Sequence, residues 1–181
     1  MLSQSDSKTE SEDSAPVSMD DVYTKPGYFF RRMQQIAVAI FMEECAEFEL
    51  TPVQYAALVA IREHPGIDAT RLSAVIAFDR STIGDVLERL ESRELIIRRS
   101  TPQDKRLKLL QLTPRGRKLL AAIMPAVDRA QERMLAPLVG TDRRKLVQLL
   151  AQLVDLNNEN SRAPLRVLES ASGQATGRSR A

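Results

Sequence analysis

Eight lysine and arginine side chains lie between positions 98 and 118, and Asp104 is the only carboxylate among them. They are Arg98, Arg99, Lys105, Arg106, Lys108, Arg115, Arg117 and Lys118. The segment offers neither a nucleophile nor a general base for a catalytic loop. What it can do is bind an anion, because clustered guanidinium and ammonium groups attract phosphates and carboxylates.

The same segment has the pattern of a β-hairpin followed by a helix. The runs LIIRRS (95–100) and LKLLQL (107–112) are β-type and flank TPQDKR, in which Pro102 begins a turn. Thr113 and Pro114 then provide the N-cap and the first position of a helix. The cations are therefore predicted to lie on and beside a short hairpin.

Helical patterns lie on both sides of this hairpin. Apolar residues recur at helical spacing over residues 28–48, 52–64, 69–77 and 79–94 before it, and over 114–139 and 142–162 after it. The predicted N-caps include Thr51, Asp68, Asp79, Thr113 and Thr141. With 181 residues, no Trp and 4% aromatic residues, the composition also favours a helical protein with a proper core. Two short helices followed by a two-stranded hairpin make a winged helix-turn-helix, so the predicted fold class is mainly α with a wing.

The helix predicted over 79–94 has an apolar and a polar side. Ile83, Val86, Leu87 and Leu90 share one side, and the residues opposite are Ser81, Thr82, Asp85, Glu88 and Arg89. The N-terminal end of such a helix approaches base edges in the major groove, where hydroxyls bond either base type and arginine pairs with guanine. A solvated surface helix is the alternative interpretation of this helix taken alone. The carboxylates of Asp85 and Glu88 would repel phosphate, but they can accept from cytosine or hold an arginine.

The hairpin adds a second candidate contact with DNA. Asp104 can fix the guanidinium of Arg106 through a charge-assisted hydrogen bond, and an arginine at a hairpin tip suits a narrow minor groove. A turn that is charged only for solubility is the alternative. Together, helix and hairpin predict a double-stranded DNA partner. The predicted DNA-binding residues are Thr70, Arg80, Ser81, Thr82, Asp85, Arg89, Arg99, Lys105 and Arg106.

Three stretches resemble the MarR family of bacterial transcription regulators: LTPVQYAALVAI, STIGDVLERLESRELIIRR and DKRLKLLQLTPRGRKL. The third is similar to the wing signature of that family, through Asp104, Arg106, Leu112, Thr113 and Gly116. The resemblance covers roughly residues 28–160. It implies a homodimer that binds a palindromic operator, usually as a repressor, with the first and the last two helices at the dimer interface. Several relatives carry a base-reading cation where this chain has Asp85, so their base contacts do not transfer directly.

The family resemblance also implies release from DNA by a small ligand, often an aromatic acid. The stretch RRMQQIAVAIFMEECAEFELTPVQY is similar to regulators of aromatic-acid breakdown, some of which respond to aryl-CoA thioesters. The candidate ligand-binding residues are Tyr28, Arg31, Arg32, Met33, Glu44 and Tyr55. The two arginines could meet an anionic ligand, remain solvated, or bind carboxylates across the dimer. Glu44 falls in the middle of an apolar helix face, where it needs a partner: either a ligand or an ion pair between subunits.

Other functional classes find less support in the sequence. One Cys and one His exclude paired-His and Cys-cluster metal sites, and no nucleophile, base and orienting group converge, so neither an enzyme nor a cofactor is expected. A pure interaction protein would not explain the cationic hairpin. A redox regulator acting through Cys45 is the main alternative, although Glu43, Glu44 and Glu47 beside it would raise the thiol pKa, and a packed core Cys is the other interpretation.

Charge and composition predict the boundaries between regions. The net charge of +2 is uneven, because residues 1–25 are acidic and Ser-rich and are predicted to be a disordered tail. We assign 26–49 and 114–161 to a helical dimerisation region, 50–113 to the DNA-binding region and 162–181 to a flexible basic tail. There is no signal-peptide pattern and no apolar run of about 18 residues, so we expect a bacterial cytoplasmic protein that lies on the nucleoid when bound to DNA.

Overall fold

The computed structural model describes residues 17–100 and 107–168. The chain divides into two compact units, one up to Gln35 and one from Ile36 onward. In the described ranges, no helix combines the length and the hydropathy needed to cross a membrane. The predicted acidic tail falls largely on residues 1–16, which lie outside the described part, as do Asp104, Lys105 and Arg106 in the hairpin turn.

The first unit contains a short helix that the sequence analysis missed. Helix α1 (Met19–Tyr23) lies inside the segment predicted to be a disordered tail. It forms because the Ser18 hydroxyl accepts from the Asp21 N–H at 3.2 Å, while the Asp21 carboxylate accepts from the Ser18 N–H at 2.8 Å. This reciprocal capping box stabilises a turn that has no buried residue of its own.

Helix α2 (Pro26–Glu44) is shorter at its C-terminal end than the predicted helix over 28–48. It stops at Glu44 and is followed by a 3₁₀ turn, η1 (Ala46–Phe48), and by Glu49 in the left-handed region at φ 49°. The Arg93 guanidinium donates to the carbonyls of Phe48 and Glu49, which satisfies groups that a continuing helix would have used. The chain can then turn into the next helix.

Two of the predicted N-caps are confirmed in the next two helices. In α3 (Pro52–Glu63), the Thr51 hydroxyl accepts from the Gln54 N–H at 3.3 Å and the Gln54 side chain accepts from the Thr51 N–H at 3.0 Å. In α4 (Ala69–Val75), the Asp68 carboxylate accepts from the Arg71 N–H at 2.9 Å. Both helices therefore begin where their local sequence predicts.

Helix α5 (Ile83–Ser92) begins later than predicted, because Asp79 does not cap it. The Asp79 carboxylate instead accepts from the N–H and from the hydroxyl of Ser81, each at 2.9 Å, and Thr82 occupies the N-cap position. An aspartate that bonds to its own backbone two residues later stabilises a turn in competition with the helix. The predicted apolar side is confirmed, since Ile83, Val86, Leu87 and Leu90 are all buried.

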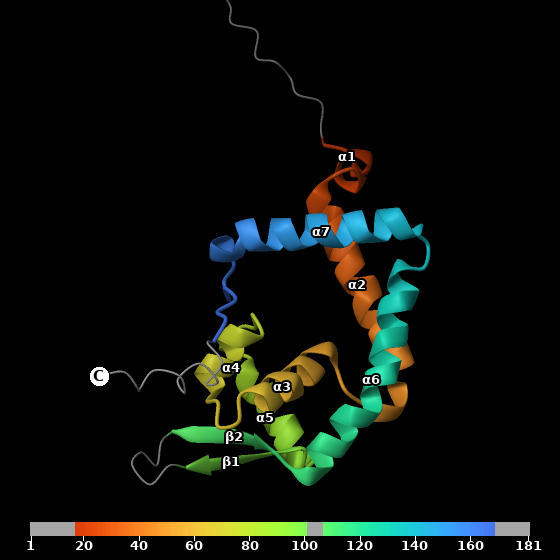
Figure 1. Cartoon of the computed structure of the whole chain (residues 1–181). Helices are drawn as coiled ribbons and strands as arrows, with labels where there is room; N and C mark the ends of the chain where they lie inside the picture. Colours follow the sequence, from red (N-terminus) through yellow and green to blue (C-terminus); the bar gives the residue numbers. More distant parts are fainter. Residues whose placement is uncertain (1–16, 101–106, 169–181) are drawn as a thin grey trace, which may run out of the picture. The chain divides into compact units, whose positions relative to one another are not determined.

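The predicted hairpin is confirmed as two antiparallel strands, β1 (Ile96–Ser100) and β2 (Lys108–Leu112), paired from Ile96↔Leu112 to Ser100↔Lys108. Leu110 also exchanges two backbone hydrogen bonds of 2.9 Å with the α3–α4 loop, from the Gly66 N–H and to the Ile67 carbonyl. Helices α4 and α5 followed by this hairpin form the winged helix-turn-helix that the sequence predicted (Figure 1).

Helix α6 (Pro114–Leu135) starts at a close contact with the end of the preceding helix. The Thr113 hydroxyl accepts from the Gly116 N–H at 2.9 Å and donates to the Glu94 carbonyl at 2.7 Å, which confirms the predicted N-cap. A Cβ atom at position 116 would lie only 2.1 Å from the Leu95 carbonyl oxygen. Glycine is therefore the one residue that lets α6 approach this backbone.

The last helix, α7 (Gly140–Leu156), begins two residues earlier than predicted. Val139 occupies the N-cap position and Thr141 lies inside the first turn, so the predicted Thr141 cap is wrong. The corner before it is held instead by Arg143, which donates to the carbonyls of Leu138 at 2.8 Å and Ala136 at 3.2 Å. A 3₁₀ turn, η2 (Asn158–Asn160), follows α7.

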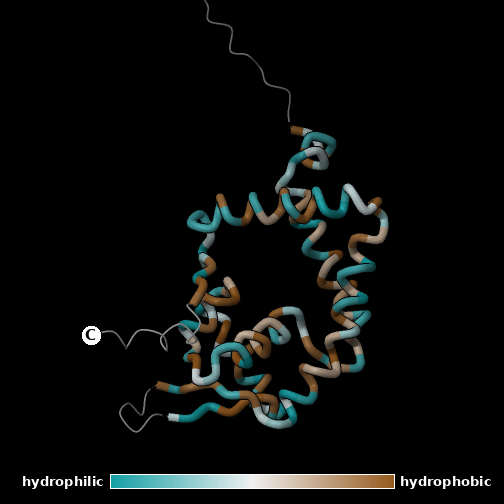
Figure 2. The backbone as a smooth tube through the Cα atoms, viewed as in Figure 1, coloured by the Kyte–Doolittle hydropathy of each residue, from teal (hydrophilic) through white to brown (hydrophobic). Residues whose placement is uncertain are grey.

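The apolar side chains of the core are buried, whereas those of α7 are not. The core packs α3, α4, α5, α6 and the hairpin together, and its fully buried side chains include Leu50, Leu58, Ile61, Leu72, Leu87, Leu90, Leu95, Leu110, Leu120 and Ile123. Helix α7 buries no residue, and four leucines that form a stripe along it are exposed: Leu149, Leu150, Leu153 and Leu156. Hydrophobic positions recur along α7 in Figure 2. An exposed apolar stripe of this kind is typical of a surface that packs against a partner.

The close contact at the start of α6 gives a stability prediction. Gly116→Ala should lower the free energy of unfolding by about 1–3 kcal/mol, because the added methyl group overlaps a backbone oxygen that cannot rotate away. Urea unfolding at a fixed protein concentration measures the change.

Gly84→Ala is the matched control, since a Cβ at position 84 in α5 meets nothing within 4 Å. It should leave stability unchanged or raise it by up to about 1 kcal/mol, as a glycine in a helix interior usually does on replacement. A Gly116→Ala protein as stable as the wild type would contradict the close contact.

Candidate nucleic-acid interface

Seven of the nine predicted DNA-binding residues belong to the described part of the chain, and all seven are exposed. They are Thr70 in the first turn of α4, Arg80, Ser81 and Thr82 between α4 and α5, Asp85 and Arg89 on α5, and Arg99 on β1. Lys105 and Arg106 lie outside the described residues. Helix, turn and wing thus present polar groups to solvent while their apolar sides pack into one core.

The turn before α5 changes the expected role of three of these residues. Arg80, Ser81 and Thr82 were predicted on the helix, but they lie in the turn that precedes it. Asp79 organises this turn, and its hydrogen bonds from the Ser81 backbone and side chain lower the carboxyl pKa. The Thr82 hydroxyl donates to the Asp79 carbonyl at 3.1 Å. Both hydroxyls are therefore oriented within the turn, with acceptor lone pairs left for a ligand.

The cations of the basic segment divide into structural and surface groups. Arg98 lies 2.9 Å from a Glu91 oxygen, an ion pair rather than a well-aligned hydrogen bond, and ties β1 to α5. Arg117 donates to the Leu112 carbonyl at 2.8 Å, and Arg115 pairs with Glu94 at 3.3 Å. These three side chains hold the wing and the start of α6 in place. The number of lysines and arginines in the segment is therefore larger than the number of cations available to DNA.

A groove beside the wing contains a cation that the predicted set omitted. Thr70 shares a cavity of about 260 Å³ with Arg98 and Lys108, between the start of α4 and β2. The Lys108 ammonium donates to the Ser100 hydroxyl at 2.7 Å across the hairpin. The exposed position of Lys108 at a strand end, next to the turn, is the signal that could have added it to the candidates.

Four predicted ligand residues lie in the first unit, on the first half of α2. The Arg31 guanidinium stacks 5.2 Å from the centroid of the Tyr28 ring, and both Arg31 and Arg32 donate to the Gln35 side-chain oxygen, at 3.3 and 3.0 Å. Tyr28 and Arg31 line a cavity of about 490 Å³ with residues of α1. Met33 is exposed, at 44% of its full area. An aromatic ring and a cation thus lie together here, as a pocket for an aryl acid requires.

The other two predicted ligand residues lie in the second unit and have partners in their own chain. Glu44 accepts from Arg129 at 3.3 Å and from Arg133 at 3.2 Å, and these bonds lower its pKa. One expectation for Glu44 was an ion pair between subunits. Its ion pairs are instead with two arginines of α6 in the same chain. The Tyr55 hydroxyl donates to the Met124 sulfur at 3.3 Å, and burial raises the pKa of this hydroxyl.

Cys45 is a packed core residue. Only 1% of its surface is exposed, and burial raises the pKa of its thiol despite the opposing charge of Arg129. A redox-sensing cysteine needs an accessible thiolate, so both observations oppose the redox alternative. The structure supports the interpretation of Cys45 as a small core side chain.

The chain is similar to known transcription regulators. The sequence profile of the MarR family matches residues 50–108. The HTH-type transcriptional repressor NicR of Pseudomonas putida is 31% identical over 157 residues, which cover 86% of this chain and 99% of NicR. An alignment of this length spans α4, α5 and the wing as well as the helices on either side.

Solved structures with the same fold include two regulators. PcaV from Streptomyces coelicolor, in complex with its natural ligand, is 33% identical, with a TM-score of 0.68 over 78% of this chain and 97% of PcaV. The transcriptional repressor CouR, bound to a 23-mer DNA duplex, is 28% identical, with a TM-score of 0.69 over 77% of this chain and 99% of CouR. CouR has also been solved bound to p-coumaroyl-CoA. These relatives are named as regulators of transcription and not as enzymes.

Proposed function

Because the chain belongs to the MarR family of transcription regulators, we propose that it is a repressor that binds a palindromic operator as a homodimer and is released by an aromatic acid or its CoA thioester. The observation that carries this proposal is the exposed polar surface on α4, the following turn, α5 and the wing. The crystal structure of CouR on a DNA duplex supports the use of this fold for DNA.

Each part of this surface has a distinct role in the proposal. Helix α5 enters the major groove with Asp85 and Arg89 facing the base edges, and Ser81 and Thr82 are close to the phosphates that flank it. Arg80 pairs with guanine or phosphate. The wing residues Arg99, Lys105 and Arg106 contact the backbone and the minor groove. Lys108 and Thr70 add polar groups beside the wing.

The dimer interface is proposed on the regions 26–49 and 114–161. Helix α7 carries four exposed leucines and buries none of its residues, so its apolar stripe is free to pack against a second copy of the chain. Two-fold symmetry then presents one α5 helix to each half of a palindrome, about 34 Å apart. The symmetry of the protein and the symmetry of the operator match.

The proposed ligand is aromatic and anionic. The names of PcaV in complex with its natural ligand and of CouR bound to p-coumaroyl-CoA show that relatives of this chain bind small molecules. In the first unit, the guanidinium groups of Arg31 and Arg32 are exposed and suit a carboxylate or phosphate, and the Tyr28 ring beside Arg31 suits an aryl group. The same family resemblance favours this ligand class.

Operator binding should depend strongly on salt. Affinity for duplex DNA from upstream of the chain's own gene should fall steeply between low and physiological ionic strength, because several cations displace condensed counterions. Arg89→Ala and Arg99→Ala should each weaken binding by about 1–3 kcal/mol. Fluorescence anisotropy over a salt series measures both effects.

Arg62→Ala is the matched control, because Arg62 is exposed, pairs with the neighbouring Glu63 at 2.9 Å and lies outside the proposed surface. Its affinity should equal that of the wild type. A flat salt response, or equal losses in all three variants, would refute the proposed DNA surface.

Ligand and operator should weaken the binding of each other. A ligand that reduces operator affinity about 100-fold must carry roughly 2.7 kcal/mol of coupling, and the operator must reduce ligand affinity by the same factor. Calorimetry with a panel of aryl acids and their CoA thioesters, with and without operator, measures the coupling. Arg32→Ala should weaken ligand binding while operator affinity stays unchanged.

A panel in which no compound binds, or in which binding is indifferent to operator, would contradict the sensor role and leave a constitutive DNA-binding protein. The control is again Arg62→Ala, which removes an exposed arginine from outside the proposed ligand residues. Its ligand affinity should equal that of the wild type.

A further inference from the structure

After α7, the chain turns back and contacts α4. Residues 158–168, here called the C-terminal strap, run from η2 back to α4 (Figure 1). The predicted flexible basic tail began at residue 162, so its first seven residues are instead seated on the helix-turn-helix. Residues 169–181 of that predicted tail lie outside the described part.

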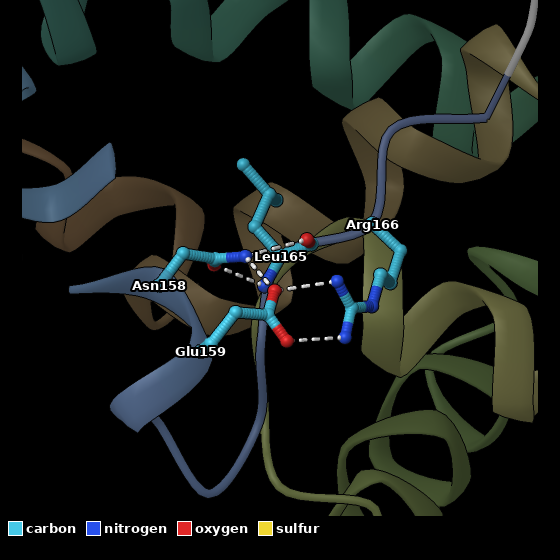
Figure 3. A network of polar contacts seen from close by, with 4 residues as sticks. All are labelled: Asn158, Glu159, Leu165 and Arg166. Carbon is cyan, nitrogen blue, oxygen red and sulfur yellow. Dashed lines mark hydrogen bonds and ion pairs between the residues drawn. The ribbon is translucent and has the colours of Figure 1, made fainter. Parts of the chain in front are cut away.

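The strap is held in shape by its own side chains (Figure 3). The Asn158 amide accepts from the Leu165 N–H at 2.8 Å and donates to the Leu165 carbonyl at 3.3 Å, so it pairs with this residue as another backbone would. Glu159 and Arg166 form a two-pronged ion pair at 2.6 and 2.9 Å. Fork-to-fork pairing of this kind fixes direction as well as distance.

Leu165 anchors the strap on the helix-turn-helix. Its side chain, 42% exposed, lines an open apolar hollow of about 420 Å³ together with Tyr55 and Val59 of α3 and Val75 and Ile76 at the end of α4. Leu168 packs against the main core a few residues later. Val167 between them is 86% exposed. The strap therefore places Leu168 against the core and Leu165 at the edge of an apolar hollow, and it leaves the intervening Val167 in solvent.

Two polar contacts join the strap to the segment that leads into α5. The Arg166 N–H donates to the Ala74 carbonyl at 2.9 Å, which satisfies an acceptor in the last turn of α4. The Arg162 guanidinium lies 3.3 Å from the Asp79 carboxylate, whose other oxygen holds Ser81. One contact falls on the last turn of α4, and the other falls in the middle of the segment 76–82 that leads into the proposed recognition helix.

We propose that the C-terminal strap positions the turn ahead of α5, with Leu165 as its anchor and with Arg162 and Arg166 as positioning residues for DNA binding. The N-terminal end of α7 follows α6, and its C-terminal end continues into the strap, which contacts the segment ahead of α5. Helix α7 itself buries no residue. A displacement of α7 is then transmitted to α5 through these contacts. The consequence for DNA affinity rests on the proposed function, whereas the local ordering of the turn does not.

Hydrogen–deuterium exchange on the full-length dimer tests the ordering directly. Leu165→Ala should raise deuterium uptake in the peptide that covers residues 74–82 and leave the peptide that covers β1 unchanged, because β1 does not line the hollow that Leu165 enters. Val167→Ala is the matched control: the residue is a neighbouring apolar side chain that does not line the cavity.

DNA binding supplies the second readout. Leu165→Ala should weaken operator affinity by roughly 3-fold to 30-fold, the range expected for a residue that acts through a coupled element. Leu165→Met should restore both affinity and protection, since it conserves volume. Arg162→Ala removes only an exposed partner of Asp79 and should therefore give a smaller change in the same direction.

The outcomes separate the strap from the proposed function. Uptake over 74–82 that is the same in Leu165→Ala and Val167→Ala would overturn the strap, whatever happens to DNA binding. Raised uptake with unchanged operator affinity would also overturn the positioning role. A wild-type chain that binds no DNA contradicts the proposed function alone, and the exchange experiment still decides the ordering of the turn.

Discussion

The backbone of Leu95 is the joint on which the DNA-binding surface depends. Its N–H donates to the Leu90 carbonyl and ends α5, its carbonyl accepts from the Thr113 N–H at 3.1 Å, and its side chain is completely buried. Gly116 lets α6 begin directly against this carbonyl. Recognition helix, wing and α6 therefore share one set of backbone contacts, so the angle of α5 relative to α6 is fixed by groups that cannot change rotamer.

Around this joint, the charges serve two purposes. Arg93, Arg98, Arg115 and Arg117 bond to carbonyls or carboxylates of the protein and hold loops and strands in place. Arg80, Arg89 and Arg99 remain exposed on the side of α5 away from its buried stripe or beside it. The same arginine-rich composition thus builds the scaffold and leaves cations for an anionic partner, and only the structure separates the two groups.

Local patterns predicted most of the elements and part of the site. Thr51, Asp68 and Thr113 were read correctly as caps, because the side-chain oxygen of each accepts from an N–H only three positions later. The predicted N-caps Asp79 and Thr141 are wrong. Asp79 bonds to Ser81 within the turn before α5, and Arg143 bonds to a carbonyl at the α6–α7 corner, so these contacts decide where the two helices begin. The partners of Glu44 lie 85 and 89 residues away, and Arg166 of the strap bonds to Ala74 of α4 over a still longer stretch of sequence, so no local pattern reveals these contacts.

The account as a whole requires two chains to read one operator, because each chain supplies a single α5 and leaves the leucine stripe of α7 uncovered. Native mass spectrometry of the protein with its operator duplex at physiological salt measures the stoichiometry directly. The account predicts a mass of two chains per duplex, with no species that carries one chain, and a loss of the complex when Leu149 and Leu153 are both changed to Glu. A duplex that carries a single chain, or an undiminished complex in the double variant, would contradict it.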